Sequence, residues 1–282
     1  MAQKETKRIF AIVMRFFVEE LYMYADFLKV AEHAARVAGG IQMKHLGKPL
    51  EVEFKGEVDI VTKVDRFSEE AIVAIIRDAY PDHQIMAEEG TAKKGDSQYR
   101  WIIDPLDGTT NYAHAFPCFA VSIGLEVSGK VVAGVVYDPV RDECFTAVDG
   151  GGAYLNGRPI QVSTIDRLDR ALLATGFPYD RREHADRYLV PFKNFLLKAQ
   201  EVRRPGAASI DLCYLASGRI DGFWECKLHP WDVAAASVIV REAGGRMSDF
   251  SGNEYSVYGE ETLASNGRIH TEMMEMLRLG AE

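Results

Sequence analysis

The chain has 282 residues, of which 47 % are hydrophobic and 27 % are charged, and these proportions are ordinary for a globular protein with a sizeable core. Its formal net charge of −9 argues against a general nucleic-acid-binding protein, which needs basic stripes on its surface. The four cysteines form no CxxC pair, so disulfides and a zinc site are disfavoured and a reducing cytoplasm is expected.

The first 23 residues are expected to be an extension before the main unit. Residues Ile9 to Val18 are mostly apolar and follow basic residues, which weakly resembles a signal peptide. Arg15 interrupts this run, acidic Glu19 and Glu20 follow it, and no small-residue cleavage site is evident. An amphipathic helix or a poorly ordered segment is the favoured interpretation. No later apolar run approaches the ~20 residues of a membrane span, so no membrane partner is expected.

The first half of the chain predicts two helices followed by several strands. Apolar residues at helical spacing predict helices over Phe27–Met43 and Arg66–Tyr80, and Pro81 stops the second. The charged segment Leu46–Glu57 contains glycine and predicts a hairpin or a mobile loop. Short apolar segments predict strands at Gln84–Glu88, Trp101–Asp104, Phe119–Val127, Val131–Tyr137 and Glu143–Ala147, with the third and fourth joined as a hairpin. The glycine-rich stretch Gly150–Gly157 predicts a run of turns.

The second half mixes short strands with longer helices. Strands are predicted at Ala171–Thr175 and Gly222–Glu225, and helices at Asp186–Gln200, Ala208–Ser217 and Trp231–Ala243. The elements show no regular βαβ repeat, so we expect an α+β protein with layered helices and sheets. We expect one unit over residues 1–282 with two lobes, 24–160 and 161–282.

One short segment combines groups suited to cations with groups suited to an anion. Asp104 ends an apolar strand, and Pro105 is expected to block further strand pairing and to fix a turn that brings Asp107 to the same side. Gly108 allows close approach of the backbone to a ligand. Residues 109–111 resemble the opening of a helical turn, whose free N–H groups suit an anion. This pattern predicts a site for a metal-bound phosphate.

Two further acidic segments accompany this one, and each has an ordinary structural explanation when it is taken alone. Glu88 and Glu89 suit the solvated end of a strand, and Asp232 suits the first turn of a helix that begins at Pro230. Asp-Pro-Leu-Asp-Gly by itself suits a turn. His114 and His229 lie near the motifs, but no HxxxH or HExxH spacing occurs, so we expect neither to be a metal ligand.

Taken together, the motifs resemble those of the inositol monophosphatase family, a group of magnesium-dependent, lithium-sensitive phosphatases, and this member looks bacterial or archaeal. The segments that carry the resemblance are D-I-V-T-K-V-D, E-E-G, W-I-I-D-P-L-D-G-T-T-N-Y, F-P-C-F-A-V-S-I-G-L, G-A-Y-L-N-G and W-D-V-A-A-A. They occur in family order over roughly Phe27 to Gly267. The resemblance implies a layered αβαβα sandwich of the sugar phosphatase type and a homodimer.

The resemblance also implies two to three bound Mg²⁺ ions. The first would be held by Glu88, Asp104 and the backbone carbonyl of Leu106, and the second by Asp104, Asp107 and Asp232. A third, weaker ion would lie near Glu88 and Glu89. Gathered carboxylates repel one another and call for such cations, and Mg²⁺ prefers oxygen ligands and retains water and phosphate oxygens.

The implied phosphate and substrate contacts follow from the same match. Gly108, Thr109 and Thr110 would cradle the phosphate, Glu225 would contact polyol hydroxyls, and Gly206, Ala207 and Ala208 would line the sugar pocket. Asp65 would hydrogen-bond Thr109 and so help to activate the attacking water. Glu88, Asp65 and Thr109 are therefore the expected catalytic residues.

The expected reaction is Mg²⁺-dependent hydrolysis of a small phosphorylated polyol or sugar, with myo-inositol 1-phosphate as the leading substrate. Arg203 and Arg204 make their segment more basic than in animal inositol enzymes, so an arginine near a second phosphate keeps fructose 1,6-bisphosphate open as a substrate. A surface or dimer-interface arginine pair is the slightly favoured alternative. Lys55 is the candidate for a lysine that the family carries before D-I-V-T. A regulatory, protein-binding relative is the remaining alternative.

Overall fold

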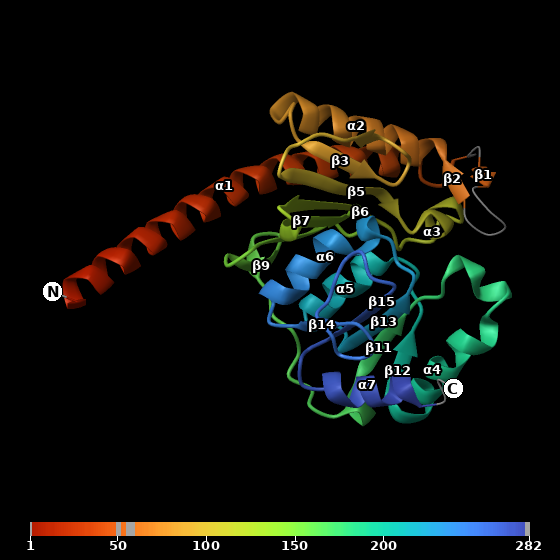
Figure 1. Ribbon diagram of the computed structural model, residues 1–282. Helices are drawn as coiled ribbons and strands as arrows, with labels where there is room; N and C mark the ends of the chain where they lie inside the picture. The colour runs from red at the N-terminus through yellow and green to blue at the C-terminus, as the bar shows by residue number, and fades with distance from the viewer. Residues whose placement is uncertain (1, 49–51, 55–59, 280–282) are drawn as a thin grey trace.

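The computed structural model describes residues 2–48, 52–54 and 60–279, and its helices and sheets alternate in five layers (Figure 1). Helices α1 (Ala2–His45) and α2 (Lys63–Ala79) cover the outer face of a first sheet. Helices α5 (Ala208–Ala216) and α6 (Pro230–Glu242) fill the space between the two sheets, and α4 (Ala185–Lys198) and α7 (His270–Arg278) cover the second. The predicted αβαβα sandwich is confirmed.

The first sheet has eight strands and comes from the first part of the chain. In spatial order they are β10 (Arg158–Pro159), β9 (Gly152–Leu155), β8 (Glu143–Val148), β7 (Lys130–Asp138), β6 (Ala120–Val127), β5 (Tyr99–Asp107), β3 (Gln84–Ala87) and β4 (Ala92–Lys93). Every pair is antiparallel except β3 with β5. The predicted hairpin is confirmed as β6–β7. The predicted run of turns instead contains strand β9, because its residues pair with β8.

The second sheet has five strands. In spatial order they are β12 (Glu201–Arg203), β11 (Leu172–Thr175), β13 (Gly222–Cys226), β15 (Glu261–Ser265) and β14 (Arg246–Ser248). The sequence analysis assigned β11 and β13 but not β12, β14, β15 or helix α7. These elements are short, and their residues are ordered by contacts with strands distant in sequence. The first sheet ends at Pro159 and the second begins at Leu172, and the division into lobes 24–160 and 161–282 stays a prediction.

The N-terminal elements differ in extent from the prediction. Helix α1 begins at Ala2 rather than at Phe27, so the expected extension is continuous with the first helix, and its N-terminal part projects away from the body (Figure 1). Strand β1 (Val52–Phe54) pairs antiparallel with β2 (Ile60–Thr62), which lies beyond the predicted segment Leu46–Glu57. Residues 49–51 and 55–57 of that segment lie outside the described residues, so the predicted hairpin or loop there stays a prediction. Lys55 lies outside the described residues. No helix among the described residues combines the length and the apolar character needed to cross a membrane.

Strand β5 passes through Pro105 instead of ending at Asp104. It pairs with β6 through Asp104 and again at Asp107, and the register shifts between these two residues. The expectation that Pro105 would end the strand pairing was therefore wrong. Proline has no N–H to donate, but an irregularity in the ladder leaves that position without a required donor. Short helices complete the chain, namely α3 (Thr109–Ala113) and 3₁₀ turns at Leu168–Arg170 and Tyr179–Arg182.

Two glycines let α6 lie close against the first sheet. A Cβ at Gly134 would come within 2.3 Å of the carbonyl oxygen of Ala235, and a Cβ at Gly124 within 3.0 Å of Ala234 Cβ. Ser122 Oγ also donates to the carbonyl of Trp231 at 3.1 Å. The sheet therefore fixes both the body and the first turn of this helix, which carries Asp232.

Gly134→Ala is expected to lower the free energy of unfolding by about 1–3 kcal/mol, because the backbone of α6 must shift to admit the methyl group. Thermal unfolding followed by circular dichroism measures the effect. Gly40→Ala is the matched control, since a Cβ at this helical position meets nothing within 4 Å. The control should leave stability unchanged or raise it by up to ~1 kcal/mol. Equal behaviour of the two variants would contradict the packing argument.

Candidate active site

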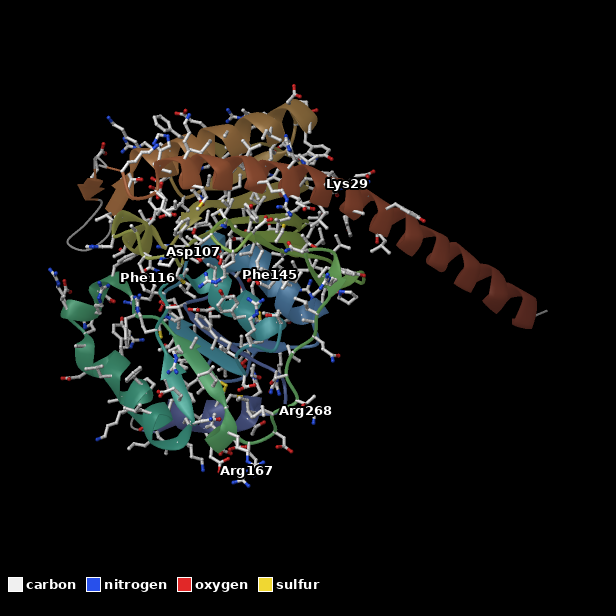
Figure 2. The ribbon with its side chains drawn as sticks, turned by 180° about the vertical axis from the view of Figure 1, so that it is seen from behind. Lys29, Asp107, Phe116, Phe145, Arg167 and Arg268 are labelled. Carbon is white, nitrogen blue, oxygen red and sulfur yellow. The ribbon has the colours of Figure 1, made fainter. Side chains whose placement is uncertain are left out.

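A cavity of about 270 Å³ lies where elements of both halves meet. Figure 2 shows Asp107 at this junction, between the first sheet and the second half of the chain. The predicted residues that line the cavity are Glu88, Asp104, Leu106, Asp107, Gly108, Thr109, Thr110, Gly206, Ala207, Ala208, Glu225 and Asp232. Asp65 and Glu89 are not among the lining residues. The structure thus brings together segments that are far apart in sequence.

The loop after Asp104 is held by hydrogen bonds on both sides. Asp104 Oδ1 accepts the backbone N–H of Leu106 at 2.9 Å. Gln42, a fully buried residue of α1, donates its side-chain amide N–H to the carbonyl of Pro105 at 2.7 Å. The backbone carbonyl of Gln42 accepts a hydrogen bond from the Tyr112 hydroxyl. Sequence reasoning missed Gln42, although its position one turn after buried Ala38 on the apolar face of α1 was a signal.

Asp65 reaches the cavity through Thr109. It lies in the first turn of α2, where its Oδ2 accepts the N–H and the hydroxyl of Thr62 in a capping box. Its Oδ1 lies 3.0 Å from Thr109 Oγ1, so the predicted hydrogen bond is present. Burial raises the pKa of Asp65, and these hydrogen bonds to the charged form oppose that rise. The part that this pair plays in the reaction stays a prediction.

Asp107 links the two halves of the chain. Its Oδ2 accepts both the N–H and the hydroxyl of Ser209, at 2.8 and 2.5 Å, in the first turn of α5. A carboxylate at this end of a helix is favoured by the helix dipole. Burial raises the pKa of Asp107 to about 6, while the bonds from Ser209 lower it. Ser209 carried no motif that the sequence analysis used, because its partner lies far away in the chain.

Asp232 serves the helix and faces the cavity at the same time. Pro230 occupies the first position of α6, and Asp232 Oδ2 accepts the backbone N–H of His229 at 2.7 Å. The ordinary role of a helix-start acid is therefore present. Burial first, and then the charge of neighbouring carboxylates, holds the pKa of Asp232 and Asp104 well above the usual range. Asp104 is only 1 % exposed.

The turn that carries Glu88 and Glu89 is organised by Glu69 of α2. The two carboxylate oxygens of Glu69 accept the N–H groups of Glu89 and Thr91 at 2.8 and 3.0 Å. Glu69 is buried, and it fixes the turn from the side away from the cavity. Its position in an ordinary amphipathic helix gave no sign of this contact.

The part of the cavity around Glu225 combines an acid with cations. Burial raises the pKa of Glu225 to about 8, and Arg204 opposes that rise. Arg204 lines the cavity together with Arg181, whereas Arg203 is exposed and pairs with Glu201. Asn111 donates its side-chain amide to the carbonyls of Cys118, Pro205 and Gly206, which holds the segment before α5 against α3.

The donor set fits Mg²⁺ without forming a complete cage. Within residues 2–48, 52–54 and 60–279, no three His, Cys, Asp or Glu side chains are placed as the ligand set of one ion. Mg²⁺ is commonly held by one or two carboxylates, with water and phosphate oxygens in the remaining positions. The described hydrogen bonds occupy one carboxylate oxygen of Asp104 and one of Asp232, so each has a second oxygen for a cation.

The acids make the stability of the metal-free protein depend on pH. Folding raises the pKa of Glu225 from 4.5 to about 8, so between these values the folded chain binds a proton that the unfolded chain releases. Stability therefore falls as pH rises from about 4.5 to about 8 and levels off above that value. With a chelator present, the unfolding temperature should drop between about pH 6.5 and about pH 8.

Glu225→Gln should reduce this dependence, because one titrating group is removed while the raised pKa values of Asp104, Asp107 and Asp232 remain. Added Mg²⁺ should raise the unfolding temperature at the upper end of the range, since an ion that binds only the folded state stabilises it. An unfolding temperature that rises over the same interval in chelator would contradict the assignment. Below about pH 6.5 the histidines oppose the trend, because burial lowers the pKa of His270 to about 4.

Comparison with known proteins identifies the chain's relatives. The model of the inositol monophosphatase family matches residues 23–279. The chain is 46 % identical over 253 residues to an inositol-1-monophosphatase from Synechocystis, covering 89 % of this chain and 88 % of that protein. It is 43 % identical over 254 residues to the Nus factor SuhB of Escherichia coli K12, covering 89 % and 95 %.

A solved structure agrees with these sequence matches. The extragenic suppressor protein SuhB from Bartonella henselae superposes with a TM-score of 0.87 at 41 % identity, over 90 % of this chain and 99 % of that one. The family match spans most of the chain and includes every element that contributes to the cavity. The chain belongs to the inositol monophosphatase family.

Proposed function

We propose that this protein is a Mg²⁺-dependent phosphatase that hydrolyses phosphate monoesters of small polyols, with myo-inositol 1-phosphate as the leading substrate. The observation that carries the proposal is the convergence of four acids and the start of α3 on one cavity. Carboxylates attract cations and free helical N–H groups attract an anion, so the arrangement suits a phosphate bound with metal ions. Family membership and the relative named inositol-1-monophosphatase support the same reaction.

The metal ligands in this proposal are the acids around β5 and α6. Glu88, Asp104 and the carbonyl of Leu106 would hold one ion, and Asp104, Asp107 and Asp232 would hold another once their side chains turn toward it. A third and weaker position would lie near Glu88 and Glu89. When bound, Mg²⁺ would polarise the phosphoryl oxygens, lower the pKa of a coordinated water and neutralise the charge of the leaving alkoxide. The carboxylates themselves determine where cations bind in a chain whose net charge is −9.

The phosphate lies against the start of α3 in this proposal. The backbone N–H groups of Gly108, Thr109 and Thr110 point from the first turn of that helix. Gly108 has φ of 90°, and a Cβ there would come within 2.9 Å of the carbonyl oxygen of Cys118. Glycine is therefore required, both by the backbone conformation and by the close approach of a neighbouring segment.

Thr109 and Asp65 orient the attacking water. Thr109 Oγ1 lies 3.0 Å from Asp65 Oδ1 and 3.1 Å from the carbonyl oxygen of Leu106. In this proposal the hydroxyl donates its single proton to Asp65, because an ionised carboxylate is an acceptor only and attracts the proton more strongly than a neutral carbonyl does. The lone pairs of Thr109 Oγ1 then remain to accept a hydrogen bond from a water beside Glu88 in the cavity. Positioning of this kind is the main requirement for in-line phosphoryl transfer.

Asp104→Asn and Asp232→Asn are expected to lower kcat by at least ~10³-fold while the protein stays folded, because each change removes a charged ligand and no core atoms. Phosphate release at saturating Mg²⁺ measures the loss, and circular dichroism checks the fold. The matched control is Asp138→Asn, which alters a buried carboxylate bonded to Val140 and Arg141 and outside the cavity lining. It should reduce stability rather than kcat. Near-normal kcat in either ligand variant would show that the metal assignment is wrong.

The leaving alcohol is the least constrained part of the proposal. Glu225 and residues 206–208 line the side of the cavity that would hold a polyol. Arg181 and Arg204 line it too, which favours a second candidate substrate with a second phosphate, namely fructose 1,6-bisphosphate. The alternative expectation placed both Arg203 and Arg204 on the surface. Arg203 is exposed and pairs with Glu201, whereas Arg204 lines the cavity.

Phosphate release from myo-inositol 1-phosphate and fructose 1,6-bisphosphate, measured side by side, separates the two substrates. We expect release from the inositol ester to require Mg²⁺ and to exceed release from the bisphosphate in kcat/KM. Equal or faster turnover of the bisphosphate would assign the enzyme to a dual class. Absence of release from both, with folded protein and Mg²⁺, would contradict the proposed reaction.

A regulatory role is a second candidate function, favoured by the 43 % identity to proteins named Nus factor SuhB. Such a role would use the outer surface and would not require the cavity. Capture of RNA polymerase components by the purified protein tests it. Retention of cellular function by Asp104→Asn would support it, and loss of that function together with catalysis would favour the enzyme. The homodimer stays a prediction for light scattering to test.

A further inference from the structure

Asp211 is a buried residue of α5 that borders the cavity, and one of its carboxyl oxygens has no hydrogen-bond donor among the described residues. It lies in the first turn of the helix, is 2 % exposed and lines the same cavity as the proposed metal ligands. Among the described residues its Oδ1 is buried without a donor. Buried polar groups are nearly always hydrogen-bonded, so an unpartnered carboxyl in a native fold calls for an explanation.

The other buried aspartates of this protein are bonded. Asp65, Asp107 and Asp232 accept N–H or O–H groups, as described above. Asp221, which precedes β13 and is not among the residues that line the cavity, accepts the Ser163 hydroxyl and the backbone N–H of Leu172, one on each oxygen. A general tolerance of bare carboxyls in this fold therefore does not explain Asp211.

The surroundings of Asp211 place it on the substrate side of the cavity. Burial raises the pKa of Asp211 most, the charges of Glu225 and Asp107 raise it further, and the charge of Arg204 lowers it. Glu225 closes over Gly176, where a Cβ would come within 2.1 Å of its Oε1. The pKa of Asp104 is raised by burial and then by the charges of Glu88, Asp107 and Asp232. Asp211 is therefore a neighbour of Glu225, whereas Glu88 and Asp232 are neighbours of Asp104.

We propose that Asp211 is a specificity-determining residue that accepts hydrogen bonds from hydroxyl groups of the substrate alcohol, beside Glu225. This inference rests on the proposed phosphatase function and extends it to the chemical class of the alcohol. Two carboxyls on one wall can accept several hydroxyls of one ring, and Arg204 offsets their charge. An ester without hydroxyls would leave Asp211 unpaired, and buried groups left unpaired discriminate strongly against such ligands.

Kinetics on two esters test the proposal, myo-inositol 1-phosphate and p-nitrophenyl phosphate, which has no hydroxyl groups. Asp211→Ala should lower kcat/KM for the inositol ester by roughly 10-fold to 100-fold, mainly through KM, because a hydrogen bond to a charged acceptor is lost. Asp211→Asn keeps one carbonyl acceptor and should lose less, about 3-fold to 10-fold. With p-nitrophenyl phosphate both variants should stay within about 3-fold of the parent protein.

Two further measurements separate substrate binding from a structural or metal role. The Mg²⁺ concentration for half-maximal rate should not change in the Asp211 variants. Their unfolding temperature should equal or exceed that of the parent, because an unpartnered buried carboxyl is removed. Asp221→Asn is the matched control and should lower the unfolding temperature without changing the ratio of the two kcat/KM values.

Equal losses on both esters, or an altered Mg²⁺ requirement, would overturn the role of Asp211 while leaving the phosphatase assignment intact. A matching change of the substrate ratio in Asp221→Asn would overturn it as well. Failure of the parent protein to release phosphate from either ester would overturn the proposed function, and the inference with it.

Discussion

Mutual repulsion among buried carboxylates is the constraint around which this fold is arranged. Two carboxylates about 4 Å apart repel by roughly 4 kcal/mol at an effective dielectric near 20, and burial adds a desolvation cost. Here Asp104, Asp107 and Asp232 are gathered at one cavity, and the pKa of each is raised by burial. Without cations they hold protons or destabilise the chain, so the same feature explains the proposed metal dependence and the expected effect of pH.

Each acid of the cluster is fixed by a different part of the scaffold, so the site is only as rigid as the contacts between layers. Asp107 is bonded to Ser209 across the junction of the two halves. Asp232 lies in the first turn of α6, and this helix packs closely against the sheet because Gly124 and Gly134 lack side chains. Gln42 of the outer layer holds the carbonyl of Pro105 in the irregular part of β5. The outer helices, the first sheet and the middle helices thus all contribute contacts that fix these acids.

The two sides of the cavity differ in how their acids are satisfied. The acids near α3 and α6 are bonded to helix starts and a turn, which leaves them structural as well as available to cations. On the other side, Oδ1 of Asp211 has no hydrogen-bond donor among the described residues. An acceptor without a donor lowers the stability of the free protein. It also discriminates between ligands, because only a ligand that supplies the missing donor recovers that free energy on binding.

The sequence by itself determined the residues whose roles depend on near neighbours. The D-P-L-D-G-T segment, the acid after Pro230, and most helices and longer strands follow from local spacing, and the motifs together indicated the family and the layered fold. The tertiary structure alone decided the bulge at Pro105, the hidden supports Gln42, Glu69 and Ser209, the short strands of the second sheet, and the bare carboxyl of Asp211. These features depend on groups far apart in the chain, and patterns of period 2 or 3.6 carry no information about which distant groups will meet.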